Sequence, residues 1–305
     1  MSRLQALQHF VAVVEAGSFT AAADRLGVAK SAVSRRVREL EQRLGAQLLN
    51  RTTRATDLTD SGRAFYERAV RVLADLDEAE AAVAQRGGRL IGTLRVALPL
   101  SFGTLHMAAP IAAFLEAHPE IDLQVDLNDR RVDLVSEGMD LALRIGHLRD
   151  STLIARKLFD VKFVTCASPA YLAAHGTPAT PEDLTDHHVL VYTNVTDPRL
   201  LPYVDAEGQS HDVRVEPRLA ASNGDLLVAA AAEGQGIVVE PNFMAAQAVA
   251  DGSLVPILHG YSRPTTPAYI VYPHTRHLSL RVRAFIDHVI AWYSGELPWD
   301  ACCGV

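Results

Sequence analysis

Apolar residues in the first 44 positions repeat every three to four residues, in stretches divided by glycines. The first stretch predicts an amphipathic helix over residues 3–16, with a buried stripe of Leu4, Leu7, Phe10, Val11 and Val14. Gly17 ends this helix, and Ser18 is a residue type that caps the start of the next one. The second helix buries Phe19, Ala22, Ala23 and Leu26, and Gly27 follows it as a sharp turn.

A third helix is predicted from about Lys30 to Leu44, and it has two unlike faces. The apolar face consists of Val33, Val37, Leu40 and Leu44. The other face presents hydroxyl groups and cations, from Lys30, Ser31, Ser34, Arg35 and Arg38. Two helices, a glycine turn and a basic polar helix follow the helix-turn-helix plan, in which the last helix enters the DNA major groove.

Residues 48–58 place apolar side chains on both sides of a short polar tip. This pattern predicts a two-stranded wing that lies beside the DNA. Its expected contacts with phosphates or the minor groove come from Arg51, Thr52, Thr53 and Arg54.

A long helix is predicted from the cap residue Thr59 to about Arg86. Its apolar residues alternate spacings of four and three, which is the a/d pattern of a coiled coil, and they are Phe65, Ala69, Val72, Leu76, Ala79 and Val83. So narrow a seam buries little within one chain, so we expect a dimerisation helix. Gly87 and Gly88 end it and form a hinge. A symmetric dimer would present two recognition helices to two half-sites.

From residue 90 onward, predicted strands and helices alternate, which indicates an open α/β sheet. The predicted helices include 102–117, and the predicted strands include 237–239. Ligands of such sheets bind beyond the carboxyl ends of the strands, near helix N-termini. The polar residues at these places are Ser101, Thr104, Asn128, Cys166, Ser168, Ser222 and Asn223. Hydroxyls and helix N-termini favour an anionic or hydrogen-bonding small molecule.

Charge divides the 305-residue chain in the same way as the apolar pattern. The whole chain has a formal net charge of −7, which taken alone argues against nucleic acid as a partner. Residues 1–71, however, hold 12 basic and 7 acidic residues, whereas residues 72–305 hold 17 basic and 29 acidic ones. A basic head on an acidic body indicates that the two segments meet different partners.

The remaining composition predicts a cytoplasmic protein without a membrane span. Polar residues interrupt the N-terminal apolar run, so it does not resemble a signal peptide, and no apolar stretch is long enough to cross a bilayer. The three cysteines, Cys166, Cys302 and Cys303, have no disulfide-framework spacing.

Motifs of enzymes and metal sites are weak. His187 with His188, and His274 with His277, lack a carboxylate or cysteine at a known ligand spacing. Gly234-Gln235-Gly236 lacks the rest of a dinucleotide fingerprint, and there is no nucleophile elbow. We therefore expect no enzyme, no cofactor and no metal.

The N-terminal sixty residues closely resemble the winged helix-turn-helix of LysR-type transcriptional regulators. The matching elements are Phe10, Ala16-Gly17-Ser18-Phe19, Ala22-Ala23, Leu26, Val33-Ser34-Arg35, Leu40-Glu41, Leu44-Gly45, Leu48-Leu49, Arg51 and Leu58-Thr59. One departure is Ala29-Lys30-Ser31, where the family often has Ser-Gln-Pro. The recognition helix therefore lacks a serine cap at this position, a loss of about 1 kcal/mol unless Ser31 provides the cap instead. Lys30 adds a cation where the family commonly has glutamine, which leaves the base preference at that position open.

The resemblance implies an α plus α/β fold in three parts. These are a winged helix-turn-helix over 1–58, a linker and dimerisation helix over 59–88, and an effector-binding domain over 89–305 built like a type 2 periplasmic binding protein. Its lobe 1 would comprise 90–160 and 267–305, and its lobe 2 would comprise 161–266. The run Leu143-Arg144-Ile145-Gly146 adds Arg144 to the expected effector contacts, and Ser18 joins the expected DNA contacts.

The resemblance also implies the partners. A homodimer, and a homotetramer built from two dimers, would bind an interrupted inverted repeat in double-stranded DNA and contact RNA polymerase. A small molecule in the cleft would shift the lobes and reposition the DNA-binding heads. The alternatives are an architectural DNA-binding protein without an effector, a regulator that senses oxidants through Cys166, and a cleft enzyme with a vestigial head.

Overall fold

A computed structural model describes residues 3–51, 56–84, 89–130, 133–134, 137–148, 153–273 and 278–301. The chain forms two compact units. Unit 1 comprises Met1–Gly92 and Asp133–Met139, and unit 2 comprises Thr93–Val132 and Asp140–Val305. Each unit is described by itself.

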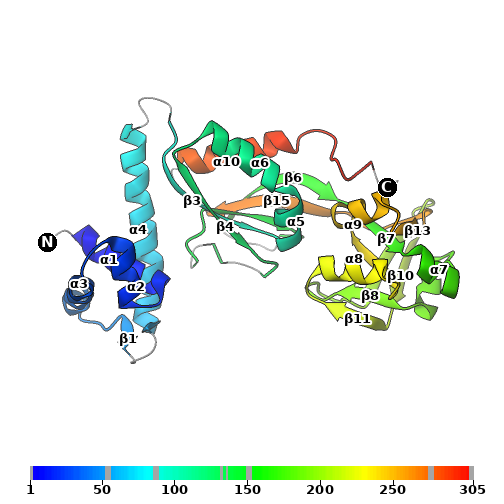
Figure 1. Cartoon of the computed structure of the whole chain (residues 1–305), viewed down its shortest axis with the longest axis horizontal. Helices are drawn as coiled ribbons and strands as arrows, with labels where there is room; N and C mark the ends of the chain where they lie inside the picture. The colour runs from blue at the N-terminus through cyan, green and yellow to red at the C-terminus, as the bar shows by residue number, and fades with distance from the viewer. Residues whose placement is uncertain are drawn as a thin grey trace. The chain divides into compact units, whose positions relative to one another are not determined.

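Unit 1 begins with three helices and a short hairpin, followed by a long helix (Figure 1). The elements are α1 (Arg3–Ala16), α2 (Phe19–Leu26), α3 (Lys30–Leu44), β1 (Leu49–Arg51), β2 (Thr56–Leu58) and α4 (Asp60–Ala84). The predicted caps are confirmed, because Ser18 Oγ accepts from the Ala21 amide at 3.1 Å and Thr59 Oγ1 accepts from the Gly62 amide at 2.9 Å. Gly27 ends α2 at φ 63°, a conformation that favours glycine.

The core of unit 1 joins these elements into one body. Phe10 is completely buried and lies with its ring centroid 5.6 Å from that of Phe65 on α4. Val33, Val37 and Leu40 bury one face of α3 as predicted, whereas Leu44 is exposed. The last turn of α3 therefore extends beyond the core.

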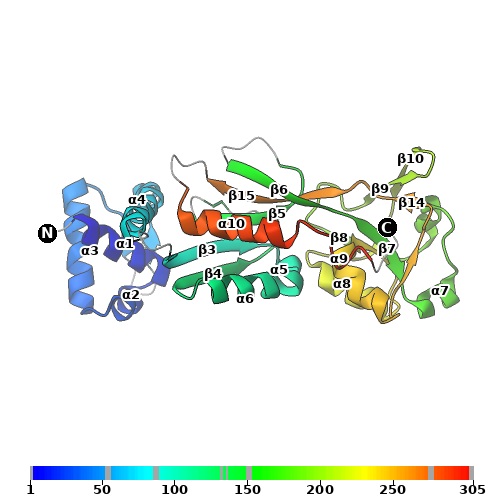
Figure 2. The ribbon, with the colours of Figure 1, turned by 90° about the horizontal axis from the view of Figure 1, so that it is seen from above.

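Unit 2 contains two five-stranded sheets, which we use to define two lobes (Figure 2). Lobe 1 has the strand order β4-β3-β5-β15-β6, with β3 and β5 parallel and β15 antiparallel to both neighbours. Its strands are β3 (Gly92–Leu98), β4 (Ile121–Leu127), β5 (Leu141–Ile145), β6 (Leu153–Val161) and β15 (Thr266–Pro273). Its helices are α5 (Leu100–His106), α6 (Ala108–Ala117) and α10 (Leu280–Trp292). Helices α6 and α10 pack together, and the Phe114 and Phe285 ring centroids lie 5.0 Å apart.

Lobe 2 has the strand order β11-β8-β12-β7-β13 and a smaller antiparallel sheet, β10-β9-β14. The strands of the larger sheet are β7 (Phe163–Ala167), β8 (Val189–Tyr192), β11 (Pro217–Ala221), β12 (Ile237–Pro241) and β13 (Val255–Ile257). Those of the smaller sheet are β9 (Leu200–Asp205), β10 (Ser210–Arg214) and β14 (Tyr261–Ser262). The helical segments are α7 (Pro169–His175), a 3₁₀ helix (Pro181–Asp186), α8 (Gly224–Ala232) and α9 (Asn242–Ala250).

The single helix predicted over 102–117 is wrong, because α5 and α6 are bent by 63° at Met107. Pro110 has no amide hydrogen to donate to the carbonyl of His106 four residues earlier. That carbonyl instead accepts a hydrogen bond of 2.8 Å from the Tyr293 hydroxyl. The broken helix thus ties α5 to the end of α10.

Within the described residues, no single helix is long and apolar enough to span a membrane. The bent pair α5 and α6 meets the length and composition criteria only when the two helices are taken together.

Candidate DNA-binding and ligand-binding sites

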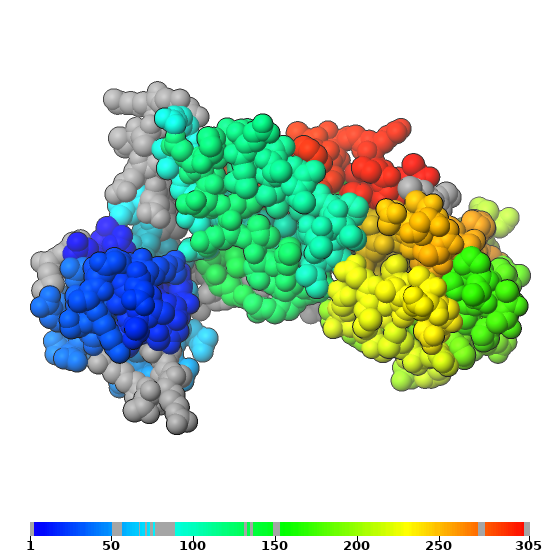
Figure 3. All heavy atoms as spheres, viewed as in Figure 1, coloured from blue at the N-terminus to red at the C-terminus, as the bar shows by residue number. Residues whose placement is uncertain are grey.

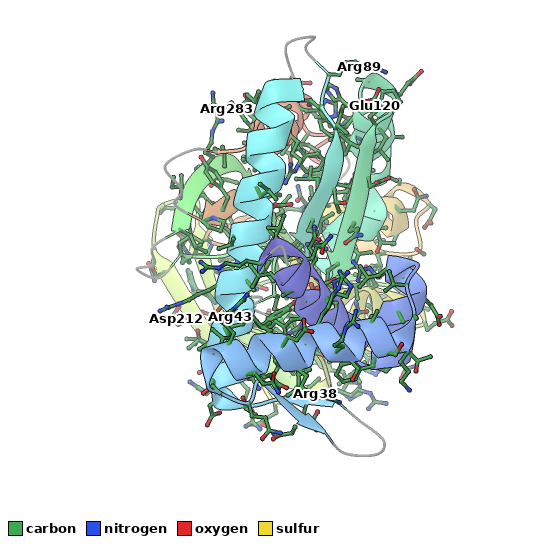
Figure 4. The ribbon with its side chains drawn as sticks, turned by 90° about the vertical axis from the view of Figure 1, so that its left-hand side faces the viewer. Arg38, Arg43, Arg89, Glu120, Asp212 and Arg283 are labelled. Atoms are coloured by element: carbon green, nitrogen blue, oxygen red, sulfur yellow. The ribbon has the colours of Figure 1, made fainter. Side chains whose placement is uncertain are left out.

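Helix α3 separates its core face from its solvent face as the sequence predicts. Lys30, Ser31, Arg35 and Arg38 are exposed, and Ser34 is half-buried. Figure 4 shows Arg38 projecting from α3 on the side away from α1. The two faces place three cationic side chains on one exposed surface, which suits contacts with phosphates and base edges.

Neighbouring charges leave most of this surface available. Arg35 has only a loose ion pair with Glu39, at 3.9 Å and with both side chains exposed, and such pairs contribute little. Arg36 differs from its neighbours because its guanidinium lies 3.2 Å from Nε2 of the buried His9 on α1. Arg36 therefore belongs to the packing of α3 on α1 rather than to the exposed face.

The start of α3 has no side-chain cap. Ala29 adopts an extended conformation with φ −66° and ψ 140°, and its side chain makes no cap hydrogen bond, as predicted. Ser31 lies inside the helix and does not replace it. The first amides of α3 are consequently available at the end of the helix that would approach DNA.

The hairpin β1–β2 stands at the predicted position of the wing, with Leu49 opposite Leu58 and Arg51 opposite Thr56. Glu41 on α3 fixes its first strand, because one carboxylate oxygen accepts from the Leu48 amide at 2.9 Å and from the Leu49 amide at 3.2 Å. The proposed contacts Thr52, Thr53 and Arg54, and the side chain of Arg51, lie outside the described residues.

The seam predicted on α4 divides into two parts. Ala69 is buried and Phe65 is partly buried, and both pack in the core of unit 1. This corrects the expectation that they face a second chain, because α4 crosses α1 at that level and uses them there. Val72 is 48% exposed and Leu76 is half-buried, so the unused part of the seam begins at Val72. The side chains of Ala79 and Val83, and the hinge Gly87-Gly88, lie outside the described residues.

The predicted ligand site lies in unit 2, where α5 of lobe 1 meets α8 and α9 of lobe 2 (Figure 3). The Ser101 hydroxyl, on α5, donates a hydrogen bond of 2.8 Å to Asp225 Oδ2 in the first turn of α8. Ser101 is buried. The two residues are 124 positions apart in the chain, so this bond joins the two lobes directly.

Asp129 is the second carboxylate of this site. It follows β4, and its Oδ1 accepts from the Leu100 amide at the start of α5 at 3.0 Å. Its carboxylate also interacts with the Tyr192 hydroxyl at the end of β8 in lobe 2. Burial raises the pKa of Asp129, and the charge of Asp225 adds to that effect. Asp129 thus contacts both lobes, and its pKa depends on the charge of Asp225.

Glu240 is the third carboxylate and the most buried, with 3% of its surface exposed. Burial raises its pKa from 4.5 to about 8, and the charges of Asp225 and Asp129 act in the same direction. Its Oε2 lies 2.9 Å from where a Cβ on Gly224 would stand, so a side chain at Gly224 would displace it. Glycine at this position lets the start of α8 approach the Glu240 carboxyl group.

The structure brings together some predicted contacts and separates others. Asn223 caps α8, since its Oδ1 accepts from the Leu226 amide at 3.0 Å, and its Nδ2 lies 3.5 Å from Asp225 Oδ2. The Ser222 carbonyl accepts from Asn194 at 3.2 Å. Ser101, Ser222 and Asn223 therefore lie at or beside the carboxyl groups.

Of three other predicted contacts, one lies next to this group and two make contacts of their own in lobe 1. Asn128 directly precedes Asp129, and its amide nitrogen donates to Asp126. Thr104 is exposed and its hydroxyl returns to the Leu100 carbonyl of its own helix at 2.8 Å. Arg144 is half-buried on β5 opposite Tyr269.

Cys166 and Ser168 correct the sequence prediction of ligand contacts. Cys166 is completely buried on β7, in a core with Leu227, Ala231 and Ala245 of α8 and α9. Ser168 is buried too, and its Oγ accepts from the Tyr171 amide at 3.2 Å to cap α7. At the end of β7, Cys166 packs in the core and Ser168 caps a helix. Neither residue therefore belongs to the group formed by Asp129, Asp225 and Glu240. An interior thiol of this kind supports a packing role over oxidant sensing.

Sequence reasoning missed Asp129, Tyr192, Asp225, Glu240 and Arg263. The strand ending at Val239 was predicted one residue too short to include Glu240. The available signal for Glu240 was a single carboxylate in the otherwise apolar run Ile237-Val238-Val239-Glu240-Pro241. Glutamate is rarely fully buried without a partner, so a glutamate in a buried strand indicates a functional site.

The adjacent histidines His187 and His188 have a structural partner in Tyr171. The Tyr171 hydroxyl lies 3.1 Å from His187 Nδ1 and accepts from the His188 amide at 2.9 Å. In the part of the chain that the structure describes, no group of three or more His, Cys, Asp or Glu residues could hold a metal ion. His274 and His277 lie outside that part.

A cavity of about 310 Å³ lies elsewhere in unit 2, against β6, β15 and α10. Its lining includes the ion pair of Arg156 with Asp287, at 2.8 Å, and Arg283. We favour the carboxyl group site between the lobes, because it stands at strand and helix ends and holds a buried Glu240 oxygen that has no hydrogen-bond partner within the described ranges.

Comparison with known proteins identifies the family of both parts of the chain. Residues 4–63 match the family described as "Bacterial regulatory helix-turn-helix protein, lysR family", and residues 87–294 match "LysR substrate binding domain". The chain is 40% identical to the HTH-type transcriptional regulator CrgA of Neisseria meningitidis over 285 residues, which are 92% of this chain and 94% of that protein.

Two solved structures extend the similarity to the whole fold. The structure of CrgA from Neisseria meningitidis has a TM-score of 0.62 and 36% identity, covering 97% of this chain and all of that one. The full-length structure of AphB, a virulence activator of Vibrio cholerae, has a TM-score of 0.64 and 31% identity, covering 96% of this chain and all of that one.

Proposed function

This chain belongs to the LysR family of transcriptional regulators, a DNA-binding and effector-binding family, and on that premise we propose how its residues divide the work. Residues 1–58 bind DNA, residues 59–88 form the linker helix, and residues 89–305 bind the effector. The observation that carries the proposal is the pair of faces on α3, with Val33, Val37 and Leu40 buried and Lys30, Arg35 and Arg38 exposed.

In DNA recognition, α3 enters the major groove. Ser31, Ser34 and Arg35 are in its first half and reach base edges, while Lys30 and Arg38 contact phosphates or guanines. The free N-terminal amides behind Ala29 add a phosphate contact. Ser18, as the cap of α2, lies at the start of the helix that crosses the backbone, and the wing contributes Arg51, Thr52, Thr53 and Arg54.

Assembly and location follow from the same proposal. Val72, Leu76, Ala79 and Val83 pair α4 with a second copy, and two dimers form a homotetramer on an interrupted inverted repeat. The protein acts in the cytoplasm and contacts RNA polymerase there. Effector binding between Ser101 and Asp225 changes how the lobes meet, and an effector alters DNA affinity only to the extent that it prefers one arrangement.

Selection of bound sequences from a randomised duplex library, using the full-length chain, tests the DNA-binding part. We expect enrichment of two half-sites related by inversion, and relaxed preference at one position of each half-site for Arg35→Ala. Arg199→Ala, an exposed arginine of lobe 2, is the matched control and should leave the preference unchanged. Enrichment of no sequence would show an architectural DNA-binding protein instead.

A further inference from the structure

Three carboxyl groups of unit 2 come together between the lobes. Asp129 belongs to lobe 1, whereas Asp225 and Glu240 belong to lobe 2, and the charges of Asp129 and Asp225 both act on Glu240. Ser101 satisfies one oxygen of Asp225, and the Leu100 amide satisfies one oxygen of Asp129. The group is therefore rich in acceptors and has few donors.

Glu240 presents an acceptor whose hydrogen-bonding capacity is unused. Among the described residues, its Oε1 has no hydrogen-bond partner although the side chain is almost wholly buried. Burial of an acceptor without a donor costs free energy, and native structures retain such groups mainly where function requires them. A ligand donor at Oε1 would remove this cost.

Arg263 is a cation that acts on this group. The charge of Arg263 acts on Glu240, and its guanidinium packs over the rings of Phe163 and Tyr203, at 5.2 and 6.0 Å from their centroids. Its Nε donates to the Pro202 carbonyl at 3.3 Å. Tyr192 is the other titratable side chain here, and burial raises its pKa, which keeps it neutral. Of the charges that act on Glu240, two are acidic and one is basic, and residues 72–305 as a whole are acidic as well.

The helix N-termini at this place do not invite an anion. The carboxylate of Asp129 occupies the first amide of α5, and the side chain of Asn223 caps α8. Asp225 in the first turn of α8 adds a further negative charge. An incoming anion would meet carboxylates where it would need donors, because like charges at close range repel.

We propose that the effector of this site carries a protonated nitrogen, an organic ammonium or guanidinium group that takes the place of Ser101 at Asp225 and donates to Glu240 Oε1. This inference rests on the proposed function, because it assigns the chemical class of that effector. An organic cation fits better than a metal ion, since among the described residues no three or more His, Cys, Asp or Glu side chains are placed so that they could hold a metal ion. The ammonium hydrogens supply the donors that the group lacks.

Binding of such a cation is coupled to proton release. The pKa of Glu240, about 8 in the free protein, keeps its carboxyl group protonated at neutral pH. A cation pairs with the ionised form, so binding expels the proton and the observed affinity rises with pH up to about 8. Few other sites would show this signature.

Calorimetric titration of the full-length chain with three compounds of one carbon skeleton tests the proposal. These are butane-1,4-diamine, butane-1,4-diol and butanedioate. We expect saturable binding of the diamine at millimolar concentration, stronger than that of the other two, with proton release measured in buffers of different ionisation enthalpy. Preferred binding of butanedioate or the diol, or no binding of the diamine, would overturn it.

Glu240→Gln keeps the shape of the side chain and removes its ability to ionise. It should weaken diamine binding by about tenfold or more and abolish proton release. Glu216→Gln, at an exposed glutamate of the same lobe, is the control and should leave both unchanged. Equal affinity of the diamine for wild type and Glu240→Gln would also overturn the proposal. A thermal melt of each variant confirms folding.

DNA binding in the same samples separates the two proposals. If the diamine binds through Glu240 but leaves operator affinity unchanged, the cation site stands and the effector role fails. If butanedioate binds between the lobes and alters operator affinity, the effector role stands and the cation proposal fails.

Discussion

The Ser101 hydroxyl donates a 2.8 Å hydrogen bond to Asp225 and thereby links the first turns of two helices from different lobes. The serine is buried, so water competes little for either group. We refer to this bond as the inter-lobe bond, because it joins residues of the two lobes directly.

Ser101→Ala should destabilise the full-length chain by about 1–2 kcal/mol, because it leaves a carboxylate oxygen without its donor. Chemical denaturation followed by circular dichroism measures the difference. Thr104→Ala is the matched control on the same helix, since its hydroxyl is exposed and bonds only to its own turn, and should change stability by less than about 0.5 kcal/mol. Equal effects of the two variants would contradict a stabilising role of the inter-lobe bond between Ser101 and Asp225.

Glu240 should make stability fall as pH rises. The folded pKa of about 8 exceeds the ordinary value of 4.5, so the folded state holds the proton more tightly, and its contribution is complete below pH 4.5 and disappears as pH rises through 8. This shift corresponds to a decrease of about 5 kcal/mol in the free energy of unfolding between pH 4.5 and pH 8. Glu240→Gln should remove this pH dependence and melt at a higher temperature than wild type at pH 9. If the melting temperatures of both proteins changed with pH in the same way from pH 5 to pH 9, the raised pKa of Glu240 would be contradicted.

Ala29→Ser should stabilise unit 1 by about 1 kcal/mol, because Ala29 already has the extended conformation that a capping serine needs. Urea unfolding of the full-length chain measures the gain. Ala21→Ser, inside α2, is the control and should be neutral or slightly destabilising. No gain from Ala29→Ser would mean that the first amides of α3 are satisfied in another way.

Arg35→Ala should weaken operator binding by about 1–3 kcal/mol if Arg35 reads a base edge, with the loss confined to one position of each half-site. A uniform loss over all sequences would identify it as a phosphate-binding residue instead. Titration at several salt concentrations separates the two cases, because removing one phosphate-binding cation reduces the salt slope by about one. Arg51→Ala should reduce that slope as well, and an unchanged slope would count against DNA binding by the wing.

Val72→Asp should dissociate the dimer, because it places a charge where the exposed part of the α4 seam begins. Sedimentation velocity measures the change. Arg68→Ala, one turn earlier and also exposed, is the control and should leave assembly intact. A variant with unaltered sedimentation would move the interface away from this face.

The helices of unit 1 were predictable because each is amphipathic and flanked by local signals. Periodicity gave the bounds of α1 and α3, with Gly17 directly after α1, and Ser18 and Gly27 bounded α2. The lobe 2 strands β9 and β10 were not predicted, since their pairing of Tyr203 with His211 depends on a hairpin context that short mixed sequences do not announce.

The ligand site was only partly predictable for a similar reason. Ser101 and Asn223 were found because strand and helix ends are visible in the sequence. Asp129, Asp225 and Glu240 come from three separate segments, and their proximity is a property of the folded unit. The expectation of an anionic or hydrogen-bonding effector rested on the helix ends and hydroxyl groups alone, because the carboxylates beside them were not visible in the sequence as neighbours.

Glu41 has a consequence for the geometry of the operator. By accepting from the Leu48 and Leu49 amides, this side chain of α3 holds the start of the wing at a set distance from the recognition helix. The DNA-binding head, residues 1–58, then has a fixed spacing between its two DNA-contacting parts within one half-site. Where a natural promoter does not match that spacing, the DNA must bend to fit it. The flexibility of the promoter's base steps therefore becomes part of the sequence specificity of the protein.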